Sequence, residues 1–138
     1  MLTKMFKVTK VIHFCYGHRL LNYEGKCRFL HGHNARVEIE ISSLALDHRG
    51  MVVDFNDMKL KLQSWIDSAL DHKLLLNPAD PLIPHLDPQK EPFVLLEANP
   101  TAEAIAKLIF DHAQEQGFPV TEVRLWETPS SFATYRAS

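Results

Sequence analysis

The sequence is poor in several features that would assign it to a specialised class of protein. Its 138 residues include only two cysteines, Cys15 and Cys27, which are too few for a disulfide framework. No apolar run approaches the ~20 residues of a membrane-spanning helix, and residues 1–10 lack the apolar run of a signal peptide. The formal net charge of -2 argues against nucleic acid or an anionic membrane as the main partner. We therefore expect a soluble, cytoplasmic protein.

The remaining composition is that of an ordinary globular protein, with 46% hydrophobic and 23% charged residues. A chain of this length can bury a real core, so residues 1–138 are expected to form one domain. The eight histidines are more than such a protein requires, and they direct attention to a possible functional site.

Two segments near the N-terminus alternate apolar and polar residues, as half-buried strands do. They are residues 5–15, with apolar even positions, and residues 33–43, with apolar odd positions. His31 and His33 share the odd parity of the second segment, so both imidazoles are expected to point inward. Further strands are expected at 51–53, 122–127 and 132–136.

Two segments carry the 3.6-residue apolar period of a helix packed on a sheet. The first follows Asp54, a predicted N-cap, and ends near residues 71–73. The second starts at Pro100 with Asn99 or Thr101 as its cap, and Gly117 ends it.

Six of the eight prolines lie in residues 77–100, which predicts a surface insertion with a short strand at 93–96. The expected order is ββααββ. It indicates the α+β class, with a four-stranded antiparallel sheet carrying two helices on one face. Such a sheet has two open edges, so we expect copies of the chain to pair edge to edge in a closed oligomer.

The segment His31-Gly32-His33 is the first candidate site. Alternate side chains of a strand point the same way, about 6.6 Å apart, and imidazole is the commonest metal ligand. A catalytic zinc site uses three protein ligands and leaves a fourth position open. His18, just beyond the first strand, is the best-placed third ligand, although a hydrogen-bonded loop histidine is an equal interpretation. Cys27 would either close the site as a structural fourth ligand or stand beside it as a free thiolate.

Asp71-His72 forms a second candidate pair, at the end of the first helix. A carboxylate there faces the negative end of the helix dipole, which is unfavourable for stability. This suggests a role as orienter and proton partner of a nucleophile or base. The alternative is a pair of solvated residues at a frayed helix end.

Glu127 is the third candidate, because it shares strand parity with Val123 and Leu125 and is expected to point inward. An inward carboxylate can accept two N–H bonds from a guanidine-like ligand edge. The alternative is an ion pair with Arg124 or Arg136.

These residues belong to six motifs that occur in order along nearly the whole chain: Phe14-x-x-x-His18-x-Leu20, Cys27-x-x-x-His31-Gly32-His33-Asn34, Val53-Asp54-Phe55, Leu70-Asp71-His72, Asn99-Pro100-Thr101-x-Glu103 and Glu127. Together they resemble the 6-pyruvoyltetrahydropterin synthase / 6-carboxytetrahydropterin synthase family. The resemblance implies the tunnelling fold, in which subunits join into trimeric barrels that stack into homohexamers.

The resemblance also assigns roles to the candidate residues. It implies that His18, His31 and His33 hold one Zn²⁺ per subunit and that Cys27 is the catalytic base.

For the remaining motifs, the resemblance implies a proton relay through Asp71 and His72, reaching a site at a subunit boundary. Glu127 would anchor the pterin ring, helped by Thr101 and Glu103 in the turn before the second helix.

The family's substrate is 7,8-dihydroneopterin triphosphate. The spacing Cys27-x-x-x-His31 is similar to that of the carboxy-forming branch, which releases triphosphate and acetaldehyde on the route to queuosine. The alternative is the pyruvoyl-forming branch, which eliminates triphosphate without cleaving the side chain. Two departures from the family pattern are the pair Tyr16-Gly17, where small residues are expected, and the length of residues 77–100.

Two interpretations from other classes compete with this one. A cupin-type metal protein would use Gly25, His31, His33 and Glu38, but Ala45 stands where that motif needs glycine and no second motif follows. The other is a non-enzymatic domain in which Cys27 closes a structural zinc site.

Overall fold

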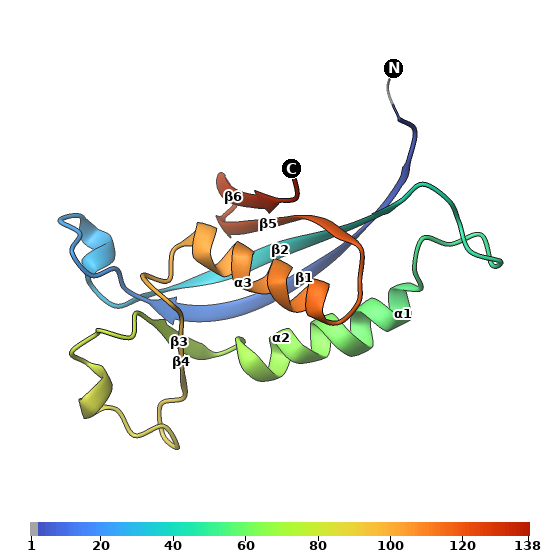
Figure 1. Ribbon diagram of the computed structural model, residues 1–138. Helices are drawn as coiled ribbons and strands as arrows, with labels where there is room; N and C mark the ends of the chain where they lie inside the picture. Colours follow the sequence, from blue (N-terminus) through green and yellow to red (C-terminus); the bar gives the residue numbers. More distant parts are fainter. Residues whose placement is uncertain (1–2) are drawn as a thin grey trace.

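The computed structural model describes residues 3–138 (Figure 1). The strands are β1 (Phe6–His18), β2 (His31–Ser43), β3 (Lys73–Leu76), β4 (Phe93–Leu95), β5 (Val120–Thr128) and β6 (Ser131–Arg136). The helices are α1 (Phe55–Met58), α2 (Ser64–Ala69) and α3 (Ala102–Glu115). A π-helical turn, η2 (Lys59–Gln63), joins α1 to α2. Two short 3₁₀ turns, η1 (Lys26–Arg28) and η3 (Ile83–His85), lie elsewhere in the chain. Within the described range, every helix is too short or too polar to cross a membrane.

All six strands join one sheet in the order β4-β3-β1-β2-β5-β6. The expected four-stranded antiparallel sheet is therefore wrong in strand number, although β1, β2, β5 and β6 do form an antiparallel unit. The two additional strands, β3 and β4, lie between the helices in the sequence and pair in parallel with β1 and with each other. β4 falls within the short strand expected at 93–96 but was not expected to join the sheet, and β3, with four residues, is too short to show an alternating pattern.

The long hairpin of β1 and β2 follows the expected alternation. The register sets Ile12 opposite Val37 and Phe14 opposite Ala35, so the apolar even positions of β1 and odd positions of β2 share one face. All four of these side chains are buried. His31 and His33 lie on this same face, as their parity predicted.

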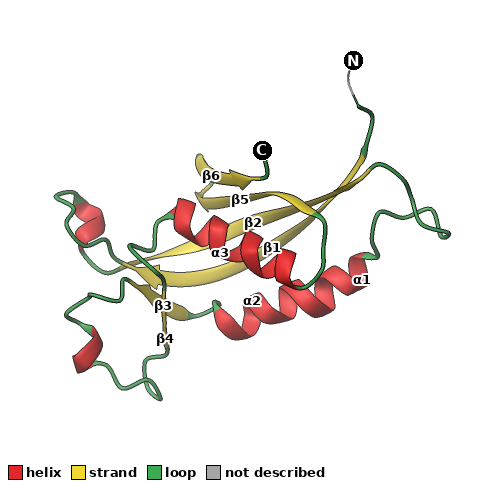
Figure 2. Cartoon of the chain, in the orientation of Figure 1, coloured by secondary structure: helices red, strands yellow, loops and turns green. Residues whose placement is uncertain are grey.

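The helices cover this one face of the curled sheet (Figures 1 and 2). Asp54 caps α1 by accepting the N–H of Asn56, and Thr101 caps α3 by accepting the N–H of Ala104. Gly117 follows α3 with φ +89°, a conformation that glycine adopts without strain. The predicted caps Asp54 and Thr101 are thus confirmed, whereas the start expected at Pro100 is wrong, because α3 begins at Ala102, after its cap.

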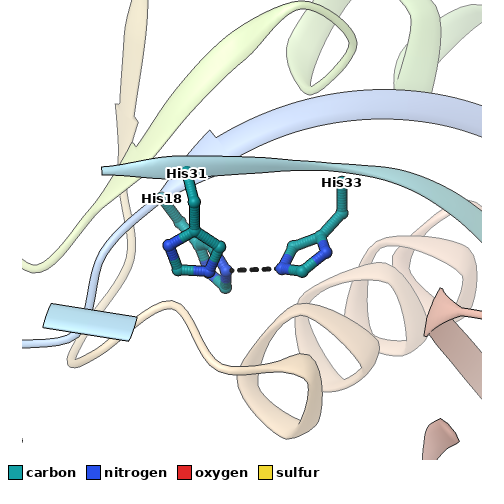
Figure 3. Close-up of side chains that lie close together, drawn as sticks. All are labelled: His18, His31 and His33. Atoms are coloured by element: carbon teal, nitrogen blue, oxygen red, sulfur yellow. Dashed lines mark hydrogen bonds between the residues drawn. The ribbon is translucent and has the colours of Figure 1, made fainter. Parts of the chain in front are cut away.

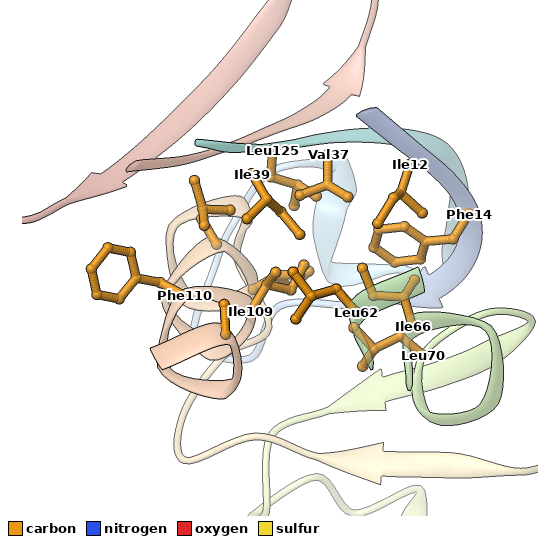
Figure 4. Packing of buried hydrophobic residues seen from close by; sticks show 14 of the residues in the cluster. Ile12, Phe14, Val37, Ile39, Leu62, Ile66, Leu70, Ile109, Phe110 and Leu125 are labelled. Atoms are coloured by element: carbon orange, nitrogen blue, oxygen red, sulfur yellow. The ribbon is translucent and has the colours of Figure 1, made fainter. Parts of the chain in front are cut away.

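The core between the helices and the sheet is continuous and apolar (Figure 4). Its helical contribution comes from one stripe on each helical segment: Met58, Leu62, Ile66 and Leu70 from the first, and Ile105, Ala106, Ile109, Phe110 and Ala113 from the second. Burial of these side chains orients α3, and so fixes the position of the residues immediately before it.

The strand expected at 51–53 is wrong, because this segment is a loop. Oδ1 of Asp47 accepts the backbone N–H groups of Arg49 and Met51, and Gly50 has φ +81°. These local hydrogen bonds hold a compact turn in place of a ladder.

The proline-rich segment is anchored to the loop that follows β1. Asp80, which is buried, accepts two hydrogen bonds from the guanidinium of Arg19, one of them at 2.9 Å from Nε. The amide of Asn99 bonds both the N–H and the carbonyl of Leu21. The strand expected at 93–96 is confirmed as β4.

Candidate metal centre and active site

Three imidazoles meet where β1 ends and β2 begins (Figure 3). His18 is the last residue of β1, not a residue beyond it, and it pairs across the hairpin with His31. His33 lies two residues along β2, on the same face. One ring nitrogen from each of the three lies within 4.8 Å of the others. The register of one hairpin is therefore enough to assemble the predicted trio.

The hydrogen bonds of the outer ring nitrogens orient two of these imidazoles. Nδ1 of His18 donates to the carbonyl of Pro100, and Nδ1 of His31 donates to that of Phe29, each at 2.7 Å. The lone pairs on Nε2 of both rings are then free to face the centre of the group. Metal-bound histidines characteristically donate their second N–H to a carbonyl in this way.

The donor set fits a zinc ion. Nε2 of His31 is buried without a hydrogen-bond partner in residues 3–138, and Nε2 of His18 faces Nε2 of His33 at 3.1 Å. Ligands around a tetrahedral zinc with ~2.05 Å bonds stand about 3.3 Å apart. The spacing of the two nitrogens is close to that value, and an ion would satisfy the orphaned nitrogen of His31.

The burial of His18 suits it to metal binding. Its side chain is 3% exposed, and this burial lowers the pKa of the imidazole against the opposing effect of the Pro100 carbonyl. A neutral imidazole is the form that binds a metal.

Glu127 lies beside the imidazoles, on the inner face predicted from its parity. Its Oε1 is 3.9 Å from Nε2 of His18, and its Oε2 is 3.8 Å from Nε2 of His33. The alternative of a partnership with Arg124 is not supported, because that guanidinium pairs with Glu122. The role of Glu127 as a ligand anchor remains a prediction.

Tyr16 was not among the predicted site residues, yet it is part of the site. Its hydroxyl donates to Oε1 of Glu127 at 2.7 Å, and its ring packs against those of His18 and His33. Burial, together with the neighbouring carboxylate, raises the pKa of Tyr16 far above its ordinary value, so the phenol stays protonated. Two features of the sequence could have indicated this role: Tyr16 has the parity of the inward-facing residues of β1, and it replaces a small residue of the family motif.

Cys27 lies in η1 and is half-buried. Its thiol is outside the donor group that meets at the three imidazoles, and within the described chain that group has three members. The arrangement thus has the ligand number of an open site rather than that of a closed structural site.

Thr101 and Glu103 lie directly after Pro100, whose carbonyl orients His18. The hydroxyl oxygen of Thr101 caps α3 by accepting the N–H of Ala104, and Glu103 is exposed in the first turn of the helix. Their predicted contact with the ligand is untested.

Asp71 and His72 form the predicted pair and are not members of the group of converging imidazoles. Asp71 accepts hydrogen bonds from the backbone N–H of Cys15 and from Nδ1–H of His72, each at 2.8 Å. Burial acts to raise the pKa of Asp71, but these hydrogen bonds outweigh it and lower the pKa below its ordinary value. The side chain of His72 is 79% exposed. It borders a cleft of about 520 Å³ whose lining includes Cys15 and Asn34 and also His31 and His33 of the imidazole group.

Comparison with known proteins decides the family. Residues 7–138 match the family model described as 6-pyruvoyl tetrahydropterin synthase. The chain belongs to this family.

Relatives and solved structures agree with this membership. The chain is 37% identical over 135 residues to a protein of Rickettsia bellii and 31% identical over 146 residues to one of Haemophilus influenzae, both named 6-carboxy-5,6,7,8-tetrahydropterin synthase. These alignments cover 93% and 96% of the chain and 98% and 99% of the relatives. An uncharacterized protein of Wolinella succinogenes superposes with a TM-score of 0.81 at 29% identity, over 98% of this chain and 99% of that one.

At 22% identity, the Caenorhabditis elegans 6-pyruvoyl tetrahydropterin synthase shares the fold, with a TM-score of 0.71 over 99% of this chain and 98% of that one. Membership of the pterin synthase family confirms the resemblance drawn from the motifs and the expectation of a lyase. The cupin interpretation is wrong, because helices cover one face of a single sheet. The interpretation as a non-enzymatic zinc domain is likewise wrong.

Proposed function

We propose that this member of the family is a zinc-dependent 6-carboxy-5,6,7,8-tetrahydropterin synthase. With water it would convert 7,8-dihydroneopterin triphosphate to 6-carboxy-5,6,7,8-tetrahydropterin, triphosphate and acetaldehyde, in queuosine biosynthesis in the cytoplasm. The observation that carries the proposal is the convergence of three imidazole nitrogens beside the carboxylate of Glu127. The names of the relatives support the choice of branch.

His18, His31 and His33 would hold the zinc ion, one per subunit. Bound there, zinc would supply a Lewis acid that binds the side-chain hydroxyls of the substrate and acidifies the adjacent C–H. The carbonyls of Pro100 and Phe29 support this role, because each fixes the ring orientation of one ligand.

Cys27 would act as the base that removes the substrate proton, since its thiol is not a member of the ligand group. Asp71 and His72 would pass that proton on. Asp71 is suited to orient the imidazole, because it accepts Nδ1–H of His72 at 2.8 Å. The 79% exposure of the His72 side chain favours action at the active site of a neighbouring subunit.

Glu127 would bind the guanidine-like edge of the pterin, which presents parallel N–H donors that a carboxylate accepts. The turn of Thr101 and Glu103 would contribute to the same pocket. The partner chains would be further copies of this protein in a hexamer, with the edge strands β4 and β6 available for pairing.

The 6-pyruvoyltetrahydropterin synthase reaction is the second candidate, favoured by the description of the matched family model. Incubation of the zinc-loaded protein with 7,8-dihydroneopterin triphosphate separates the two. Equal amounts of triphosphate and acetaldehyde are expected. Triphosphate without acetaldehyde would move the chain to the pyruvoyl branch, and the absence of both would refute the proposed function.

A further inference from the structure

Glu127 lies only slightly too far from the imidazoles to be a metal ligand itself. Its two oxygens are 3.9 Å and 3.8 Å from Nε2 of His18 and of His33. Ligands on a tetrahedral zinc stand about 3.3 Å apart, so the carboxylate is roughly half an ångström beyond a ligand position. Carboxylate oxygens are good zinc ligands. A small rotation of this side chain would give the ion a fourth protein ligand.

Tyr16 opposes that movement. Its hydroxyl donates to Oε1 of Glu127 at 2.7 Å, a hydrogen bond to a charged acceptor and so stronger than a neutral one. The donor is itself held firmly. Tyr16 is 3% exposed, lies within β1 opposite His33, and packs against the ring of Phe14 at a centroid distance of 5.5 Å.

The two positions of Glu127 have opposite chemical consequences. A carboxylate bound to the ion would fill the fourth position, as in closed structural sites. The oxygen that binds the ion would also no longer accept one of the paired N–H donors of a ligand. The hydrogen bond from Tyr16, by contrast, occupies one lone pair of Oε1 of Glu127. The other lone pairs of the carboxylate remain available to accept N–H donors of a ligand.

We propose that Tyr16 is a positioning residue that holds Glu127 away from the metal and thereby keeps the fourth coordination position open. This inference rests on the proposed metal site, and it assigns a task to a residue that departs from the family pattern. Tyr16 acts through Glu127 and takes no part in proton transfer.

The test compares variants of the full chain loaded with Co²⁺, whose visible absorption reports its ligands. Azide, a small anionic ligand, is titrated into wild-type protein, Tyr16→Phe, Glu127→Gln and the double variant. Tyr135→Phe is the matched control, because it removes a tyrosine hydroxyl from β6, where the ring packs against Phe110.

In wild-type protein and in Tyr135→Phe, azide is expected to change the cobalt spectrum. In Tyr16→Phe its apparent affinity should fall about tenfold or more, as expected when the ~1.5–3 kcal/mol of a hydrogen bond to a charged group is lost. Co²⁺ itself should bind at least as tightly as in wild type. The double variant should regain the azide response, since the neutral amide that replaces the carboxylate of Glu127 is a far weaker competitor for the ion.

An unchanged azide titration in Tyr16→Phe would overturn the inference while leaving the proposed function intact. A weakened response that persists in the double variant would also overturn it, because the effect would not pass through Glu127. Failure of the wild-type protein to bind Co²⁺ would instead refute the metal site and, with it, both proposals.

Discussion

Nδ1 of His18 lies 2.7 Å from the carbonyl oxygen of Pro100, although 82 residues separate the two in sequence. The residue that precedes α3 therefore orients an imidazole at the end of β1. Because α3 is held by its apolar stripe in the core, the helix fixes the ring orientation of a candidate ligand. The candidate metal centre is coupled in this way to the packing of the core.

The first prediction follows from the three-histidine group. His18→Ala should lower zinc affinity by more than the ~10–100-fold typical for loss of an outer hydrogen-bond partner, because a ligand itself is removed. Zinc per subunit is measured after dialysis at limiting metal. His13→Ala is the matched control, since His13 lies on the same strand but is exposed on the opposite face. Undiminished zinc in His18→Ala would contradict the site.

The second prediction separates the base from the ligands. Cys27→Ala should keep its zinc but lose turnover by about 10²–10⁴-fold, the usual contribution of general acid–base catalysis. Its thiol lies outside the group of converging donors, which is why the metal should remain. Metal content and triphosphate release are measured on the same sample, with Cys15→Ala as the control thiol for metal content. Loss of zinc from Cys27→Ala would reassign Cys27 as a ligand.

The candidate site was more predictable from sequence than the sheet was. Parity alone placed His31 and His33 on the core face, because the period of a strand is fixed and one face must be apolar. Glu127 followed from the same rule applied to β5. These conclusions need only local sequence and the burial of one face.

Features that depend on distant partners were not predictable in this way. β3 and β4 are short and parallel: β3 pairs with β1, and β4 pairs with β3. The strand of β4 was expected, but no local pattern indicated β3 or showed that β4 joins the sheet. Tyr16 and Glu127 are 111 residues apart, and nothing local to either indicates their hydrogen bond. The contact exists only because β1 and β5 both flank β2 in the sheet.

The third prediction tests the subunit boundary. Cys27→Ala and His72→Ala should each be inactive alone, but co-assembly of the two should restore activity. Suppose that Cys27 works with His72 of a neighbouring subunit. When equal amounts of the two variants assemble at random, about one quarter of the active sites then contain both an intact Cys27 and an intact His72. Triphosphate release is measured on co-expressed variants, with each variant expressed alone as the control. No recovery in verified mixed oligomers would place both residues in the site of one subunit.

The fourth prediction concerns the anchor of the proline-rich segment. Hydrogen bonds from Arg19, opposed by burial, lower the pKa of Asp80 below its ordinary value. A carboxyl whose pKa is depressed by folding stabilises the protein above its unfolded pKa of ~3.9, and this contribution is lost as the pH falls through the lower folded pKa. Asp80→Asn should therefore cost about 2 kcal/mol of unfolding free energy at pH 7.

The difference between wild-type protein and Asp80→Asn should persist down to about pH 5 and shrink below about pH 4, where Asp80 of the unfolded chain becomes protonated before that of the folded protein. Urea unfolding of chelator-treated protein at several pH values measures it, and the titration of the histidines cancels because both proteins share them. Asp111→Asn is the control, since its pair with Lys107 lies on the exposed face of α3 and surface pairs contribute little. A difference that stays constant below pH 4 would mean that the Asp80 carboxylate is not what holds the segment against Arg19.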